Sequence, residues 1–219
     1  MSELTAGDLV AARRYARALA RYACGGTKGR GKLDPVYVGV TQGRDSRANW
    51  KRYSSCGDLL HWHAERMGVD APWINRDRKD PPRHWEFLPG HDNIAKLQYP
   101  GPARATPVNY LPEAGDYLLC WNTGNGDVHV RVAGNTDAGV LETFDYGAGG
   151  MSQSEFPGAS CGHVKLVTNG GHLALESLRT HAVKRVAKVI PLPVILALAG
   201  DRCPSLTGEE IDELEARVG

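Results

Sequence analysis

A series of short apolar segments separated by turn residues, beginning near residue 115, constrains the fold of this chain most. The segments "GDYLLCWN", "DVHVRVAG" and "GVLETFDYG" each have the length and composition of one β-strand. Between them, "NTGNG" and "GNTDAG" supply the Asn, Asp and Gly that tight hairpin turns require. Further on, "GHVKLVT" and "HAVKRVAKVIPL" predict two more strands, or a strand and a helix. We therefore expect an antiparallel sheet after residue 115.

Helical patterns precede and follow these strands. Residues 3–23 place apolar side chains at three-to-four spacing opposite an arginine face, as an amphipathic helix does. A second helical pattern runs from Cys56 and stops at Gly68. Near the end, Thr207 stands three residues before Glu210, which is a capping-box pattern for a short terminal helix. The order predicts an α+β fold with N-terminal helices packed on an antiparallel β-sheet.

The length of 219 residues and the 42% hydrophobic content suit one main domain. We expect an N-terminal helix and linker over residues 1–30, and a main domain over residues 31–190. The remaining segment, 191–219, is expected to combine an apolar stretch that joins the core with the short terminal helix. Residues 70–112 are rich in Pro, Asp, Arg and His, and predict a long loop region that covers or carries a site.

The charge balance gives no reason to expect nucleic acid or an anionic membrane as partner, because 26 Lys and Arg oppose 25 Asp and Glu. The N-terminus lacks the apolar core of a signal peptide, since arginines 13, 14, 17 and 21 interrupt it. The most apolar run, Val189–Gly200, is about half the ~20 residues that a membrane helix needs. We expect a protein that is cytoplasmic as synthesised and has no membrane span.

Five cysteines, an odd number without CxxC spacing, favour reduced thiols over disulfides or a zinc ribbon. The pair His61 and His63 lies about 200° apart around a helix, so the two cannot chelate one ion together. We expect no metal and no cofactor. In "SCGH", Cys161 and His163 share one face of an extended segment, but no helix start follows them, and a structural role is favoured.

Cys56 differs from the other cysteines because it stands at the start of a helical pattern. Ser55, followed three residues later by Asp58, resembles a capping box, so Cys56 falls on the first turn. There the positive end of the helix dipole and free backbone N–H groups favour the thiolate, and the same N–H groups can receive an oxyanion. Cys24, Cys120 and Cys203 lack this context and are expected to be core or surface thiols.

A thiolate nucleophile needs a base, and His129 in "DVHVRVAG" is the best candidate. Its strand alternates Val128, Val130 and Val132 with His129, so the imidazole is expected on the face opposite the valines. The neighbouring strand offers Glu142 or Asp145 to orient the imidazole. These two acids are three residues apart and lie on opposite faces of a regular strand, so only one of them can face His129.

The segments "SSCGDLLHWHAERMG", "LPEAGDYLLCWN" and "DVHVRVAGN", followed by an acidic strand, resemble the NlpC-type and CHAP cysteine peptidase and amidase superfamily in order and spacing. The resemblance covers about residues 50–147 and implies a papain-like fold. It also implies that Cys56 is the nucleophile, His129 the base and Asp145 or Glu142 the orienting acid.

The resemblance further implies a hydrolase that cleaves amide bonds in peptidoglycan, either in the stem peptide or at its link to sugar. A phage, prophage or effector origin is implied too, with release by lysis, carriage in a virion or delivery by a secretion machine. Two alternatives remain: a non-catalytic phage or effector module with the same fold, and an acyl or amine transferase using the same site. Side chains expected to contact substrate are Tyr53, Ser55, Asn49 and His63, with core packing as the alternative for His63.

Overall fold

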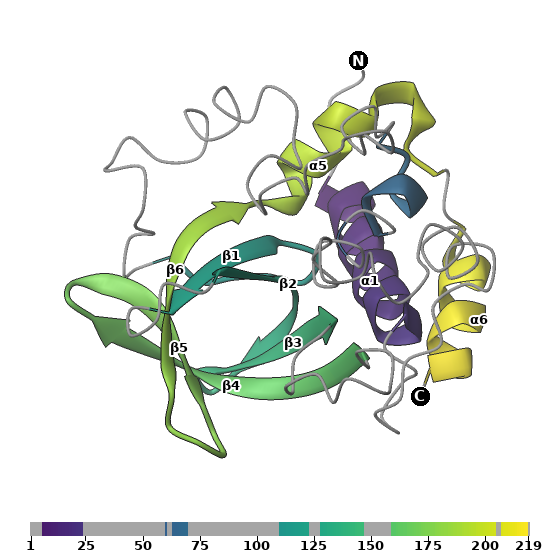
Figure 1. The fold of residues 1–219 in the computed structure, drawn as a ribbon. Coiled ribbons are helices and arrows are strands. Elements are labelled where there is room, and N and C mark those ends of the chain that lie inside the picture. Colours follow the sequence, from purple (N-terminus) through teal and green to yellow (C-terminus); the bar gives the residue numbers. More distant parts are fainter. Residues whose placement is uncertain are drawn as a thin grey trace, which may run out of the picture.

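The computed structural model describes residues 6–23, 60, 63–69, 110–122, 128–146, 159–204 and 207–218. Among these residues, helix α1 (Ala6–Ala23) precedes six strands, and α5 (Leu192–Ala199), the 3-10 turn η3 (Gly200–Arg202) and α6 (Gly208–Val218) follow them. The chain therefore combines helices with an antiparallel sheet, the α+β arrangement expected from the sequence. Figure 1 shows the helices gathered on one side of the sheet.

The six strands form a closed antiparallel barrel in the order β1-β2-β3-β4-β5-β6. Their bounds are β1 (Tyr117–Asn122), β2 (Val128–Asp137), β3 (Val140–Tyr146), β4 (Ala159–Asn169), β5 (His172–Ser177) and β6 (Val183–Ile190). Each strand pairs with the next along the chain, and β1 closes the barrel by pairing with β6. The sequence predicted β1, β2 and β3, and two strands or a strand and a helix for the segments of β4 and β6, both of which are strands. "HLALES", the segment of β5, was not recognised as a strand.

Two of the hairpin turns have positive φ at both central residues, and the first of them lies in the predicted turn "GNTDAG". Between β2 and β3, Ala138 and Gly139 have φ values of 46° and 79°. Between β4 and β5, Gly170 and Gly171 have φ values of 59° and 78°. Positive φ at both central residues matches the right-handed twist of the flanking strands, which keeps these hairpins tight.

The barrel wall separates two apolar clusters. The helix-side cluster joins α1, residues 60 and 63–69, and α5 to the outward faces of β1, β2 and β3, where Tyr117, Val130, Val132 and Phe144 are buried. The barrel-interior cluster contains Leu118, Cys120, Ala133, Leu141, Val164, Leu173, Leu175, Val186 and Val189. Neighbouring residues of β1 thus belong to different clusters, as the two-residue period of a strand requires. The apolar run after β6 enters the first cluster through α5, which confirms its expected place in the core.

Residues 63–66 are helical, and this helix ends where the sequence predicts. Gly68 has a φ of 81°, and the N–H of Val69 donates to the carbonyl of Ala64 at 3.0 Å. A Cβ at Gly68 would lie 2.1 Å from the carbonyl oxygen of Arg202, so only glycine fits under η3. The capping box of α6 is also confirmed: the N–H of Thr207 donates to Glu210 Oε2 at 2.9 Å, and the N–H of Glu210 donates to Thr207 Oγ1 at 3.3 Å.

Candidate active site

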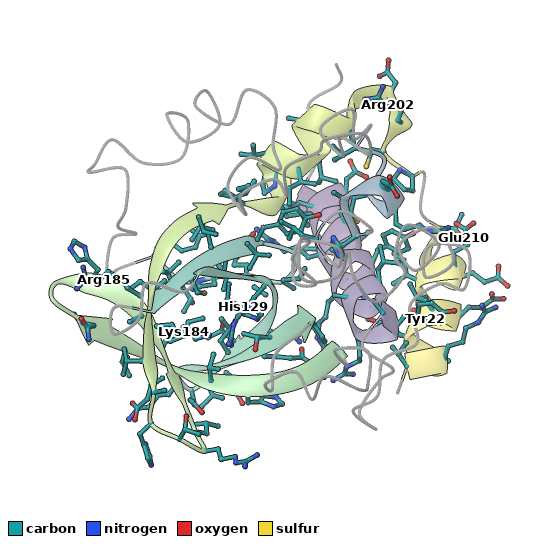
Figure 2. All side chains as sticks on the ribbon, viewed as in Figure 1. Tyr22, His129, Lys184, Arg185, Arg202 and Glu210 are labelled. Atoms are coloured by element: carbon teal, nitrogen blue, oxygen red, sulfur yellow. The ribbon has the colours of Figure 1, made fainter. Side chains whose placement is uncertain are left out.

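His129 is the second residue of β2, and its register partner on the neighbouring strand β1 is Cys120. Cys120 belongs to the barrel-interior cluster, whereas Val130 and Val132 belong to the helix-side cluster. Directly paired residues of an antiparallel ladder share a face, so the imidazole lies on the barrel-interior face, opposite the valines, as the sequence indicated. His129 is half-buried, and Figure 2 shows it within the barrel.

Glu142 lies on the other face of the sheet. Its carboxylate accepts hydrogen bonds from Arg17 Nε at 2.6 Å and Arg21 Nη2 at 2.8 Å, both from α1. Burial alone would raise the pKa of Glu142, but the bond from Arg17 and the charges of Arg17 and Arg21 lower it below its usual range. Glu142 therefore holds α1 against the barrel, and its side chain does not share a face with His129.

Gly134 of β2 makes room for this ion pair. A Cβ at that position would lie 2.4 Å from Glu142 Oε2, closer than side-chain atoms approach. The sequence signal for the anchor was the arginine face of the N-terminal helix, which includes Arg17 and Arg21. The other candidate acid, Asp145, is in β3 and pairs along the backbone with Ser160. The structure does not describe the side chain of Asp145.

His63 was expected either to line the site and contact substrate or to fill the core, and its side chain lies in the core. The side chain is fully buried, with Nδ1 2.8 Å from Tyr117 Oη and Nε2 2.8 Å from the carbonyl oxygen of Ala16. Burial lowers its pKa to about 4, while the bond to Ala16 acts in the opposite direction. A buried imidazole with both nitrogens engaged joins three elements of the core and cannot reach a substrate.

Cys56 and the three other expected substrate-contacting residues, Tyr53, Ser55 and Asn49, lie outside the described residues. The described end of the same predicted helix is buried: Leu60, Ala64 and Met67 belong to the helix-side cluster. This part of the helix packs on the sheet face opposite His129.

The three described thiols are poor nucleophiles. Cys120 is fully buried in the barrel. Burial raises the pKa of the Cys203 thiol. Burial and, next, the charge of Glu142 raise the pKa of the Cys161 thiol, whose Sγ donates to Glu142 Oε1 at 3.9 Å. A raised pKa lowers the thiolate fraction at neutral pH, so these thiols are expected to react slowly.

Asp116 follows Gly115 in the segment "LPEAGDYLLCWN", and its side chain is fully buried and holds several elements together. One carboxylate oxygen accepts from Tyr110 Oη at 2.5 Å and from the N–H of Glu113 at 3.0 Å. The other accepts from the N–H of Leu192 at 2.9 Å and from Arg13 Nη1 at 3.3 Å. Asp116 thus ties the start of β1 to α1 and α5, and the "GD" dipeptide was its signal in the sequence.

Among the described residues, no group of three or more His, Cys, Asp and Glu side chains is placed to bind a metal ion. In the same part of the chain, no helix is both long and apolar enough to cross a membrane. No family model, curated protein or solved structure matches this chain.

Proposed function

We propose that this protein is a papain-like cysteine hydrolase that cleaves amide bonds, with Cys56 as nucleophile and His129 as general base. The observation that supports this most is the position of His129: half-buried, at the start of β2, on the face that the strand pattern assigns to it. The poor nucleophilicity of Cys120, Cys161 and Cys203 supports it further, because it removes three competing thiols.

In the proposed reaction, the Cys56 thiolate attacks the carbonyl carbon of the scissile amide, and the resulting oxyanion is received by backbone N–H groups at the helix start. Protonated His129 donates its proton to the departing nitrogen, so the C–N bond breaks and an amine leaves. Water then gives a proton to His129 and attacks the thioester carbonyl. The acyl group leaves as a carboxylic acid, and the Cys56–His129 pair is regenerated.

The orienting acid in this proposal is Asp145. Glu142 is bound by Arg17 and Arg21 on the helix side of the sheet, so it is not available to accept a proton from His129. Asp145 stands three residues further along β3, and an odd separation changes the face in a regular strand. An acid on the face of His129 would fix the tautomer in which one ring nitrogen accepts the thiol proton.

Peptidoglycan is the substrate class proposed, on the basis of the resemblance over residues 50–147. Tyr53, Ser55 and Asn49 are proposed to contact it, because they precede Cys56 in the same segment. A phage, prophage or effector setting is part of the same proposal. Transfer of the acyl group to an amine would use the same residues, with the amine replacing water as second nucleophile.

One observation favours a non-catalytic module instead. Leu60, Ala64 and Met67 pack on the sheet face opposite His129, and a nucleophile on that helix must reach around the barrel edge to meet the imidazole. A domain with this fold that only binds a ligand does not require Cys56 and His129 to come into contact.

Loss of turbidity of purified cell walls tests the proposed function. The wild type is expected to clear the suspension, and Cys56→Ala and His129→Ala are each expected to reduce the rate by at least about a hundredfold. The matched control is Cys203→Ala, which removes a half-buried thiol with a raised pKa and should leave the rate unchanged. Equal rates for the wild type and both active-site variants would contradict the peptidoglycan hydrolase.

A further inference from the structure

Three basic side chains project into the barrel near one of its ends. Each belongs to the register partner of a barrel-interior residue: His129 of Cys120, Arg131 of Leu118 and Lys184 of Leu175. Directly paired residues of an antiparallel ladder share a face of the sheet, so all three side chains lie on the interior face. His129, Arg131 and Lys184 together form the basic end of the barrel.

The three residues follow one another from the rim of the barrel inward. Strand β1 pairs with both β2 and β6, and its residues give the level of each: Asn122 pairs with Lys184, Cys120 with His129 and Leu118 with Arg131. Each step of two residues corresponds to about 7 Å along the strand. Lys184 therefore stands nearest the rim, where β1 ends and β6 begins. Figure 2 shows Lys184 and His129 within the outline of the barrel.

A ligand of these cations must approach from the rim. His129, Arg131 and Lys184 are each half-buried, and Arg131 Nη1 donates to Thr143 Oγ1 on the neighbouring strand at 3.4 Å. Further inside, the barrel-interior cluster is apolar, and side chains fill the interior of a barrel with so few strands. Lys184 is thus the first charged group of the basic end that an approaching ligand meets.

The acidic residues of the strands do not neutralise the basic end. Glu142 and Glu176 each follow a barrel-interior residue and so lie on the outer face, and Asp137 is exposed at the opposite end of β2. Among the described side chains, none forms an ion pair with Lys184. Asp145, which the proposed function places on the interior face, offsets one positive charge. Because lysine and arginine are both charged at neutral pH, the basic end keeps a net positive charge and attracts an anion.

We propose that the basic end binds a carboxylate of a peptide ligand, with the ammonium of Lys184 as its direct partner. The charge of Arg131, deeper in the barrel, adds to the attraction, and the carboxylate lies near His129. The choice of a carboxylate rests on the proposed function, because the substrates of that reaction are peptides and their anionic groups are carboxylates. In that reaction, Lys184 selects substrates that carry a carboxylate close to the scissile amide.

Binding is measured on the full chain carrying Cys56→Ala, so that it holds or fails separately from the proposed hydrolysis. The probe is N-acetyl-glutamate α-amide, and the control is N-acetyl-glutamine α-amide, which has the same shape without the charge. Nuclear magnetic resonance of the His129 imidazole should give a dissociation constant of about a millimolar for the glutamate probe. The glutamine probe should bind at least about fivefold more weakly, since it lacks the ion pair.

Substitutions of Lys184 test its assignment. Lys184→Gln should weaken binding of the glutamate probe by about two- to fivefold and leave binding of the glutamine probe unchanged. Lys184→Arg, which keeps the charge, should retain the preference for the glutamate probe. The matched control is Lys165→Gln, because Lys165 is exposed on the outer face, where it pairs with Glu176.

Equal binding of the two probes, or an equal loss of affinity in Lys184→Gln and Lys165→Gln, would overturn the proposal. Tighter binding of inorganic phosphate than of the glutamate probe would assign the basic end to phosphate, and would likewise overturn it. A preference for the glutamate probe in a protein that does not clear cell walls would contradict the proposed hydrolase and support the carboxylate site.

Discussion

At the scale of single residues, His63 has one tautomer that satisfies both of its neighbours. The carbonyl oxygen of Ala16 can only accept, so Nε2 carries the proton, and Nδ1 accepts from the hydroxyl of Tyr117. Tyr117 is equally buried, and burial raises its pKa well above the ordinary value, so the hydroxyl keeps its proton to donate. The imidazole is neutral in the folded protein at neutral pH.

This arrangement predicts a loss of stability in mild acid. The pKa of His63 is about 4 when folded against 6.5 when unfolded, so between these values the unfolded chain binds the extra proton. Stability therefore falls as pH drops from about 6.5 to about 4, by roughly 3 kcal/mol from this residue. Urea unfolding of the wild type and of His63→Gln across this range measures it. The variant should lose less stability on acidification, and parallel curves would contradict the assignment.

Gly115 is required by two constraints at once. Its φ is 88°, and a Cβ there would lie 2.8 Å from Ala16 Cβ of α1. Gly115→Ala is expected to destabilise the protein by roughly 2–4 kcal/mol, combining backbone strain with overpacking. Gly171→Ala is the matched control, because Gly171 has a φ of 78° but nothing within 4 Å of the added Cβ, and should cost only about 1 kcal/mol. Urea unfolding measures both variants. An equal loss of unfolding free energy in Gly115→Ala and Gly171→Ala would show that the close contact of Gly115 with α1 does not affect stability.

At the scale of elements, α1 is held to the barrel by a buried ion pair as well as by apolar packing. Glu142 has a side chain 4% exposed and binds Arg17 and Arg21, which are 24% and 21% exposed. Glu142→Gln should destabilise the fold by roughly 3 kcal/mol, because two partly buried guanidinium groups lose their counter-charge. Glu215→Gln, which weakens a more exposed pair with Arg14, should destabilise the fold much less than Glu142→Gln does.

The rate of Cys56 alkylation, measured on folded protein, shows whether Glu142 or Asp145 orients His129. Glu142→Gln should leave the rate unchanged, because Glu142 anchors α1, whereas Asp145→Asn should slow it. If Cys56 were alkylated more slowly in fully folded Glu142→Gln, Glu142 would act in the active site, which would contradict its assignment as an anchor of α1.

Local sequence patterns predicted most of the described elements because their signals lie within a few residues. The helical period of residues 3–23, the capping box at Thr207 and the hairpin turn at Gly139 each depend on near neighbours. Strand β5 could not be predicted from local patterns because its segment, "HLALES", has a composition that suits a helix as well as a strand. Pairing with β4 and β6 decides its structure, and that pairing is tertiary.

At the scale of the whole molecule, barrel closure could not be predicted from the sequence. It depends on Tyr117 meeting Ile190, two residues far apart in the chain, and on a bulge at Leu119 and Cys120. The site was predicted in part. Strand alternation gave the face of His129, but two alternatives could not be decided from the sequence because long-range contacts decide them. His63 is enclosed by α1 and β1, and Glu142 is bound by arginines more than a hundred residues away.

Closure of the barrel gives the sheet an inner and an outer face, and different functional side chains lie on each face. The outside of β1, β2 and β3 carries the helices and the Glu142 anchor, and the inside carries Cys120 and the face of His129. The proposed hydrolase therefore requires a thiolate that reaches His129 at the end of the barrel.

Iodoacetamide labelling at neutral pH, with each labelled peptide identified by mass spectrometry, tests that requirement most directly. Cys120 is buried and Cys161 and Cys203 have raised pKa values, so they provide slow internal references. A Cys56 thiolate should react at least about tenfold faster than these references, and His129→Ala should remove most of that difference. Labelling of Cys56 no faster than Cys203, or a rate unaffected by His129→Ala, would contradict the Cys56–His129 site.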